Sequence, residues 1–334
     1  MKRNYFMLAA ATMLFAACAE TDVLVDVSEK ENAPQAIGFE TFADNITRQV
    51  GANDARNLKS YHDAFGVFAY KTTKNDAVMP NYKVVYLIDN DDLTWEYAGV
   101  GEQTIKYWDK NAEYSFYAYA PYAASGVTEN AGVISIEEGE YAANENLQTW
   151  GTDLNTNKFS GVGAASTTAS TDWMIAEEVE GYDNYTAQVP EVFSHIMSKL
   201  VVKLQSTVAN TTINSVSVNN VHGKGSYNGT TWSTGNNAAK NIVGVVGNIA
   251  TAQTPYYTME YLLIPSNDVP KFSVNYTISG DTYNVENVEI TGITSFEANT
   301  KYELTVTIDL NSIQFTASAL DFNTPQQGGS VTIE

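Results

Sequence analysis

A single cysteine, Cys18, occurs among the 334 residues, so the chain cannot form an intramolecular disulfide. Histidine is almost as scarce, and His62, His195 and His222 are spread along the sequence. No HExxH, CxxC or nucleophile-elbow motif is present, which excludes the familiar metalloprotease, redox and serine-hydrolase sites. We therefore expect no enzyme, although a glycosidase pair of carboxylates leaves no sequence motif and stays open.

Positive charge is also in short supply, with 18 Lys and Arg against 39 Asp and Glu and a formal net charge of -21. Removing residues 1–17, which hold Lys2, Arg3 and no acid, takes the net charge from -21 to -23. A surface of this sign repels phosphate backbones, so the composition excludes nucleic acid as a partner. The same charge suits a soluble, exposed protein.

No segment has a sustained apolar period of 3.6 residues, so we expect few helices. The sequence is instead rich in Tyr, Thr, Asn and Val and breaks into short alternating runs separated by polar turns. Such runs predict an all-β fold built from β-sandwiches, and the length allows two domains of ordinary size. The expected strands are 65–70, 82–87, 95–97, 106–108, 113–119, 213–218, 256–264, 272–278, 283–290 and 302–310.

Three polar segments between the expected strands are candidates for binding sites. Residues 89–92 (Asp-Asn-Asp-Asp) could ligate calcium, but the EF-hand spacing is absent and Asx-rich turns commonly hold no metal. Residues 144–171 predict a long exposed loop with a short strand around Lys158-Phe159. Asn228-Gly229 predicts a hairpin turn, and the nearby glycines lack the spacing and the helix of a phosphate loop.

The first 34 residues have the pattern of an export signal followed by a tether. Met1-Lys2-Arg3 is basic, residues 5–15 are apolar but too short to span a bilayer, and Ala16-Ala17-Cys18 follows. A lone cysteine after such a run resembles the lipobox of bacterial lipoproteins, which implies that residues 1–17 are removed and that Cys18 carries lipid. Residues 19–34 are acidic and polar, as in a tether; acidic residues at this place also resemble surface-export signals.

Residues 36–49 organise the rest of the chain in our interpretation. Residues 37–42 alternate with a period of two, which predicts a short β-strand. An arginine, Arg48, closes this stretch, and a polar segment rich in Gly, Asn and Asp follows it. We interpret the strand as one that fills a groove in the next domain. A protease would remove it by cutting between Arg48 and Gln49, with Arg56 as the alternative site.

The C-terminal residues alternate again, with a break at residues 325–329. Two edge strands of the second domain would have this pattern. An arm that leaves its own domain and completes a neighbour's sheet would have it too, because every second side chain must fill a pocket. The candidate donor residues are Ile313, Phe315, Ala317, Ala319, Val331 and Ile333, of which Phe315 is the largest.

Five motifs taken together resemble the fimbrillins, the pilin subunits of type V pili in anaerobic Gram-negative bacteria. They are Cys18, Ile37-Gly38-Phe39 before Thr47-Arg48, residues 65–70, residues 172–176 and Phe193-x-His195-x-x-x-Lys199-Leu200. The resemblance covers nearly the whole chain. It implies two tandem transthyretin-like β-sandwich domains, at 49–188 and 189–334. They would follow a tether and removable first strand at 18–48, and the donor tail would occupy about 311–334.

The resemblance also implies how such a chain functions. A lipidated precursor reaches the outer membrane, an arginine-specific surface protease cuts it, and its first strand leaves. The C-terminal strand of another copy, or of a related pilin subunit, then fills the open groove. The product is an extracellular fimbrium that serves adhesion, and no cofactor is required.

Alternatives to this function stay open. A surface lipoprotein that binds glycans would use exposed aromatic residues as stacking platforms, and a lipid-anchored enzyme would need a pocket with paired carboxylates. Among pilus subunits, Arg48 and the apparently complete tail favour a stalk or accessory subunit over a tip adhesin or an anchor. His195 has no evident nucleophile near it in sequence, so we predict a packing or hydrogen-bonding role. The candidate platforms are Trp95, Trp108, Trp150 and Trp232.

Overall fold

The chain is built from β-strands throughout its described part, and the predicted all-β class is confirmed. No helix in that part is long and apolar enough to cross a membrane. The computed structural model describes residues 34–43, 58, 62–72, 76–89, 92–99, 101, 103–138, 150–153, 158–160, 171–222, 225–235, 240–244, 248–249, 257–290, 292–310 and 312–322.

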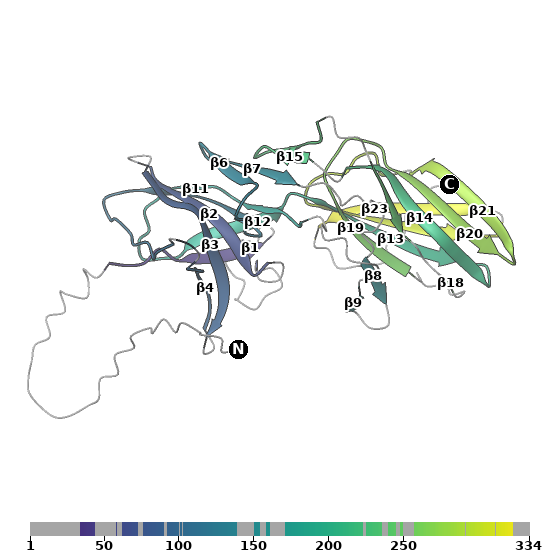
Figure 1. Ribbon diagram of the computed structural model, residues 1–334, viewed down its shortest axis with the longest axis horizontal. Helices are drawn as coiled ribbons and strands as arrows, with labels where there is room; N and C mark the ends of the chain where they lie inside the picture. Colours follow the sequence, from purple (N-terminus) through teal and green to yellow (C-terminus); the bar gives the residue numbers. More distant parts are fainter. Residues whose placement is uncertain are drawn as a thin grey trace, which may run out of the picture. The chain divides into compact units, whose positions relative to one another are not determined.

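Eight strands of the N-terminal half form one sheet, in the order β10-β12-β1-β4-β3-β2-β5-β11 (Figure 1). β10 also pairs with β5, which links two distant places in this series. The strands are β1 (Phe39–Ala43), β2 (Ala64–Lys71), β3 (Asp76–Asp89), β4 (Asp92–Tyr97), β5 (Tyr114–Ala120), β10 (Met174–Ala176), β11 (Val179–Tyr182) and β12 (Val189–His195).

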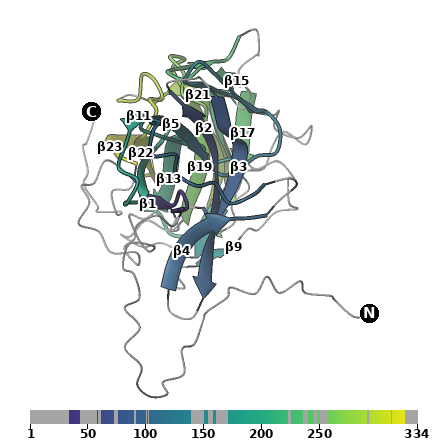
Figure 2. The ribbon, with the colours of Figure 1, turned by 90° about the vertical axis from the view of Figure 1, so that its left-hand side faces the viewer.

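A six-stranded sheet, β23-β22-β13-β19-β8-β9, joins strands of the C-terminal half to β8 and β9, which precede β10 in the chain; in a five-stranded sheet β18 joins the series β17-β14-β20-β21. Figure 2 labels β23, β22, β13 and β19 of the first sheet and β17 and β21 of the second. The first comprises β8 (Trp150–Asp153), β9 (Lys158–Ser160), β13 (Ser198–Ser206), β19 (Tyr257–Leu263), β22 (Thr300–Ile308) and β23 (Ile313–Asp321). The second comprises β14 (Thr211–Val221), β17 (Lys240–Gly244), β18 (Asn248–Ile249), β20 (Lys271–Ile278) and β21 (Asp281–Glu289).

A small four-stranded sheet, β16-β15-β7-β6, combines strands from both halves of the sequence. Its turn at Asn228-Gly229 confirms the predicted hairpin. Gly229 has φ of 92°, where a side chain would be strained, and the Asn228 carboxamide oxygen accepts hydrogen bonds from two backbone amides. The strands are β6 (Val127–Asn130), β7 (Val133–Glu138), β15 (Gly225–Tyr227) and β16 (Trp232–Ser233).

Each half of the chain has its own hydrophobic core. Buried residues between 37 and 193 form one cluster rich in aromatic rings, whereas buried residues between 200 and 317 form another made mainly of Leu, Ile and Val. Two cores on separate sheets fit the tandem β-sandwiches expected from the sequence. The division at residue 189 stays a prediction, and β12, which it assigns to the second domain, pairs with β1 and β10 of the first sheet.

One expected strand, 106–108, is not formed. Tyr107 makes only an isolated antiparallel bridge with Ala36. The reason lies in the side chains that follow, because Asp109 accepts a hydrogen bond from the Asn111 amide and turns the chain. Residues 103–113 therefore form a loop.

Candidate functional site

The interior position of β1 in the eight-stranded sheet marks the candidate site. β1 runs parallel to β12 over five residue pairs, from Phe39 opposite Val189 to Ala43 opposite Phe193. Its other neighbour is β4, which it meets at a single antiparallel pair, Phe39 with Trp95. β1 therefore joins β12 to β4, although it lies far from both in sequence.

The side chains of β1 fill an apolar groove in the N-terminal core. Ile37 and Phe39 are each 2% exposed, and Ala43 is fully buried. The Phe39 ring meets Phe65 and Phe116 edge-on, with centroids 5.6 and 6.0 Å away. Such aromatic contacts add stability beyond the apolar area that they bury. Phe39 is thus the main anchor of the strand.

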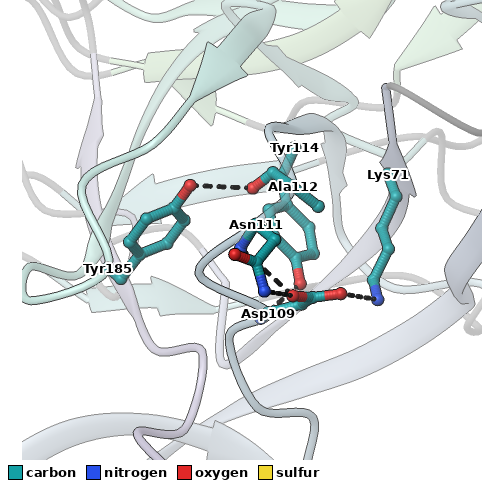
Figure 3. A network of polar contacts seen from close by, with 6 residues as sticks. All are labelled: Lys71, Asp109, Asn111, Ala112, Tyr114 and Tyr185. Carbon is teal, nitrogen blue, oxygen red and sulfur yellow. Dashed lines mark hydrogen bonds and ion pairs between the residues drawn. The ribbon is translucent and has the colours of Figure 1, made fainter.

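The loop at residues 103–113 holds the start of β1 in place. The Ile37 amide donates a 2.8 Å hydrogen bond to the Lys106 carbonyl oxygen. Farther along the loop, Lys71 donates to the Asp109 carboxylate, whose other oxygen accepts from Asn111 (Figure 3). The Lys71 hydrogen bond also holds the pKa of the Asp109 carboxyl below its ordinary value. This network fixes the loop against which β1 rests.

Two further contacts in Figure 3 tie the same loop to β5 and to the turn between β11 and β12. The Asp109 amide donates to the Tyr114 hydroxyl, and the Tyr185 hydroxyl donates to the Ala112 carbonyl oxygen. The Trp108 ring packs edge-on against Tyr114, with centroids 4.9 Å apart. The end of the groove that receives Ile37 is therefore held together by contacts among residues outside β1.

A buried carboxyl group lies beside β1. Glu191 of β12 is fully buried, and neither of its carboxyl oxygens has a hydrogen-bond partner. In the ladder it lies opposite Thr41 of β1, which is also buried. Burial raises the pKa of Glu191 to about 8, because a charge is poorly solvated there. Glu191 is thus largely neutral at pH 7 in this setting.

The C-terminal tail forms an edge strand of its own half. β23 pairs along its whole length with β22, from Ile313 opposite Ile308 to Asp321 opposite Thr300. In the described residues β22 is its only strand neighbour. Phe315 is half-buried and meets Phe272 edge-on with centroids 5.5 Å apart. In this structure the tail is thus an edge strand of the C-terminal half, one of the two arrangements that its alternating pattern allowed.

The last described residue, Phe322, fixes the end of the tail. Its ring is 4% exposed and stacks on His195, with centroids 3.7 Å apart and planes 19° apart. The His195 Nδ1 atom lies 2.8 Å from the Asp172 carboxylate. His195 therefore has the packing and hydrogen-bonding role predicted from the sequence.

The chain also matches a known protein family. The model of a family described as fimbrillin-like matches residues 47–321. The chain belongs to the fimbrillin-like family. The matched region includes β23 and excludes β1. A search of the curated proteins finds no match.

Solved structures share the fold of this fimbrillin-like chain. A putative cell adhesion protein from Bacteroides ovatus has a TM-score of 0.57 and 18% identity, with 88% of this chain and all of the other covered. A fimbrial protein from Bacteroides vulgatus has a TM-score of 0.54 and 15% identity, with 86% of this chain and all of the other covered. At these identities the likeness shows the fold.

Several residues singled out from the sequence lie outside the described residues. The lipid attachment at Cys18 and the cleavage sites stay predictions. The same holds for the donor residues expected near the C-terminus, beyond Phe322. Within the described part, no group of three or more His, Cys, Asp or Glu side chains is placed to hold a metal. The undescribed candidates are Cys18, Arg48, Gln49, Arg56, Val331 and Ile333.

The tryptophans give little support to a glycan platform. Trp95 and Trp108 are buried in the N-terminal core, and the side chain of Trp150 is not described. Trp232 is half-buried beside a cleft of about 660 Å³, where its Nε1 atom donates a 2.7 Å hydrogen bond to the Ile196 carbonyl oxygen. No two of the described tryptophans form an exposed pair.

Glu191 received no role in the sequence analysis, which placed a domain boundary just before it, at residue 189. A signal for it exists. Residues 189, 191, 193 and 195 alternate with their neighbours, and all four are buried. A glutamate within an otherwise inward-facing row is unusual, because unpaired carboxylates are rarely fully buried.

Proposed function

We propose that this fimbrillin-like protein is a stalk or accessory subunit of a surface fimbrium that assembles by protease-triggered strand exchange and serves adhesion. The observation that carries the proposal is the interior position of β1 in the eight-stranded sheet. β1 lies N-terminal to Arg48, so a cut between Arg48 and Gln49 separates it from the rest of the fold. Lipid on Cys18 would anchor the precursor to the outer membrane.

Loss of β1 would create a strong binding site. The backbone groups of β12 that pair with β1 would lose their partners, and the pockets of Ile37 and Phe39 would open. Unpaired ladder groups and open apolar pockets are what an added strand satisfies. An alternating strand from another subunit would therefore bind there, and the proposed donor is the C-terminal tail of another copy or of a related pilin.

Arg48→Ala tests the protease step. The variant should be exported and folded, but it should retain residues 18–48 and give none of the denaturant-resistant multimers expected of the wild type. Arg56→Ala is the matched control and should mature normally. Normal multimers from Arg48→Ala together with a block in Arg56→Ala would move the cleavage site to Arg56. Normal multimers from the variant with both substitutions would contradict protease-triggered exchange.

Truncation before Ile313 tests the donor step. The shortened chain should still be exported and cleaved, and it should accept a donor strand without supplying one. We expect long polymers to disappear, because each subunit then blocks further growth. A normal ladder of multimers from the truncated chain would show that the tail serves only its own domain. Circular dichroism of the shortened chain checks that it still folds.

Cys18→Ala tests the lipid anchor. The variant should carry no lipid label and should assemble poorly at the surface, since its precursor is no longer held at the membrane. Unchanged labelling and unchanged surface assembly would contradict the lipidation of Cys18.

Two other pilus roles make different predictions. An anchor subunit would keep residues 18–48 in the assembled fibre, and a tip adhesin would need no donor tail. The Arg48→Ala and truncation experiments therefore also separate a stalk subunit from these alternatives.

A further inference from the structure

Two segments near opposite ends of the described chain carry similar rows of side chains. Residues 37–43 (Ile-Gly-Phe-Glu-Thr-Phe-Ala) and 313–319 (Ile-Gln-Phe-Thr-Ala-Ser-Ala) agree at their first, third and seventh positions. The pattern Ile-x-Phe occurs nowhere else in the sequence. Alternate residues of a strand point to one face, so both segments can present Ile, Phe, a smaller residue and Ala in that order.

The two rows differ in how well they are covered. In 37–43 all four residues of the row are at most 2% exposed. In β23, Ile313 and Phe315 are half-buried, Ala317 is buried and Ala319 is exposed. The tail thus has a row that matches the groove of β1 while its own edge position covers that row incompletely.

We propose that β23 of a second copy of this chain occupies the place of β1, parallel to β12, with Ile313 at the position of Ile37. The proposal rests on the strand exchange of the proposed function, which already names the C-terminal tail as donor, and adds to it the direction and the register of the donor strand. Phe315 then takes the place of Phe39, Ala317 that of Thr41, and Ala319 that of Ala43.

The groove accepts this row without a change in its largest pocket. Phe315 would meet Phe65 and Phe116, the rings that now surround Phe39. In its present place Phe315 has an aromatic contact with Phe272. Both settings thus offer the ring an edge-on aromatic neighbour, so the exchange replaces one such contact with others of the same kind.

The two strands differ at the remaining positions of the match. On the other face Thr316 would replace Glu40, which is exposed, and Ser318 would replace Phe42, which is buried. In the row itself Ala317 would replace Thr41 opposite Glu191, removing a hydroxyl and a methyl group beside that carboxyl. The register therefore predicts which substitutions in β23 block assembly and which do not.

Two substitutions that introduce the same side chain test the register. Ala319 is exposed in β23, so Ala319→Phe should leave the subunit folded, exported and cleaved. In the groove it would take the fully buried place of Ala43, so multimers should fall at least tenfold. Thr316→Phe would take the exposed place of Glu40 and should polymerise nearly as well as the wild type. Wild-type polymerisation of Ala319→Phe, or a block in Thr316→Phe alone, would overturn the register.

A disulfide cross-link tests the register independently of packing. In the ladder Val192 lies opposite Phe42, so the proposed register places Ser318 of the second copy opposite Val192. One copy carries Val192→Cys and the other Ser318→Cys, and the two are co-expressed as full chains. Neighbouring Cα atoms in a sheet lie within the range that a disulfide spans. Thr316→Cys and Leu320→Cys are the controls, since either would link after a slip of two residues.

The cross-link separates failure of the register from failure of strand exchange. Peptide mapping identifies the joined cysteines and sets aside any link through Cys18. A link from residue 318 that disappears in Arg48→Ala is the expected result. A preferred link from residue 316 or 320, or polymers without any of the three links, overturns the register while exchange stands. A wild type that forms no multimers at all overturns the proposed function itself.

Discussion

Two glutamates, one in each large sheet, are buried beside the two strands that the proposed assembly moves. Glu191 lies opposite Thr41 of β1, and Glu303 of β22 lies opposite Ser318 of β23. Both side chains are at most 5% exposed, yet their surroundings differ. Glu191 has no hydrogen-bond partner on either oxygen, whereas Glu303 has lysines close to both of its oxygens.

The lysines reverse the effect of burial at Glu303. The Lys203 Nζ atom lies 2.8 Å from one carboxylate oxygen, and the Lys301 Nζ atom lies 3.1 Å from the other. Burial alone would raise the pKa of Glu303, but the hydrogen bonds and charges of the two lysines outweigh it and lower the pKa. Glu303 is therefore ionised at neutral pH and its charge is compensated within β13 and β22.

Of the two glutamates, only the one beside β1 lacks a hydrogen-bond partner for its carboxyl group. β23 lies beside a carboxylate that is neutralised without it, so its departure changes little there. β1 lies beside Glu191, whose raised pKa means that the closed groove disfavours its ionisation. If water reaches Glu191 when β1 leaves, its ionisation at neutral pH stabilises the open groove. The N-terminal half would thus hold β1 less tightly than its apolar contacts alone suggest.

Glu303→Gln should have the largest effect on this comparison. It removes the buried negative charge that Lys203 and Lys301 both contact, so the free energy of unfolding should fall by about 3–5 kcal/mol at pH 7. Urea unfolding measures the loss. Since the pKa of Glu303 is lowered, the wild-type advantage is present above its ordinary pKa and shrinks as the pH falls through the folded value. A loss below about 1 kcal/mol would mean that the ion pairs do not compensate the burial.

Glu191→Gln should act in the opposite direction. The wild type has its full stability below pH 4.5, the ordinary pKa, and loses stability as the pH rises towards about 8. One pKa unit corresponds to about 1.4 kcal/mol, so the variant should be more stable than the wild type by roughly 3 kcal/mol at pH 7. The two proteins should converge at about pH 4. Equal pH profiles of unfolding would show that Glu191 is solvated or paired.

The strands of the fold were largely predictable from the sequence, whereas their neighbours were not. The predicted strands 65–70 and 272–278 lie within β2 and β20, and the predicted strand 302–310 overlaps most of β22. Alternation could predict them because a period of two is a local property of the sequence. The parallel pairing of β1 with β12 joins distant parts of the sequence, such as Phe39 and Val189, and no local pattern encodes it. β8 at 150–153 was expected to be loop, and it is a strand through its pairing with β19.

The candidate site was predicted only in part for the same reason. The alternation of 37–42 predicted the strand, and the resemblance supplied its proposed role. The neighbours of Phe39 and the burial of Glu191 depend on pairing and packing between distant segments. Phe322 escaped notice because its stacking on His195 joins residues that are remote in sequence.

Phe322→Ala should have a smaller effect and tests whether the tail is held at its end. The loss of a buried ring that stacks on His195 should cost roughly 2 kcal/mol. Hydrogen exchange should accelerate in β23 while β13 and β22 stay protected, since β23 has a single strand neighbour in the described sheet and each of them has two. Asp321→Ala, at an exposed position, is the control. Uniform acceleration across the C-terminal half would show that β23 does not open separately.

Lys71→Met should have the smallest effect and sharpens the account of the preformed groove end. It removes the 2.9 Å ion pair between Lys71 and Asp109. The two side chains are 25% and 37% exposed, so the loss of stability should be small. The pKa of Asp109, measured by NMR, should rise towards its ordinary value. The Ile37 amide should exchange faster, because the loop that accepts its hydrogen bond is less well fixed. An unchanged Ile37 rate would mean that the loop is held by its aromatic contacts alone.

The most direct test of strand removal is the N-terminal residue of the subunits within denaturant-resistant multimers recovered from the cell surface. Mass spectrometry of the dissociated multimers gives it without any substitution. Strand exchange after cleavage predicts Gln49, or Asn57 (immediately after Arg56) if the alternative site is used, and no peptide from residues 37–43. Multimers whose subunits begin at Cys18 and retain β1 would contradict the account.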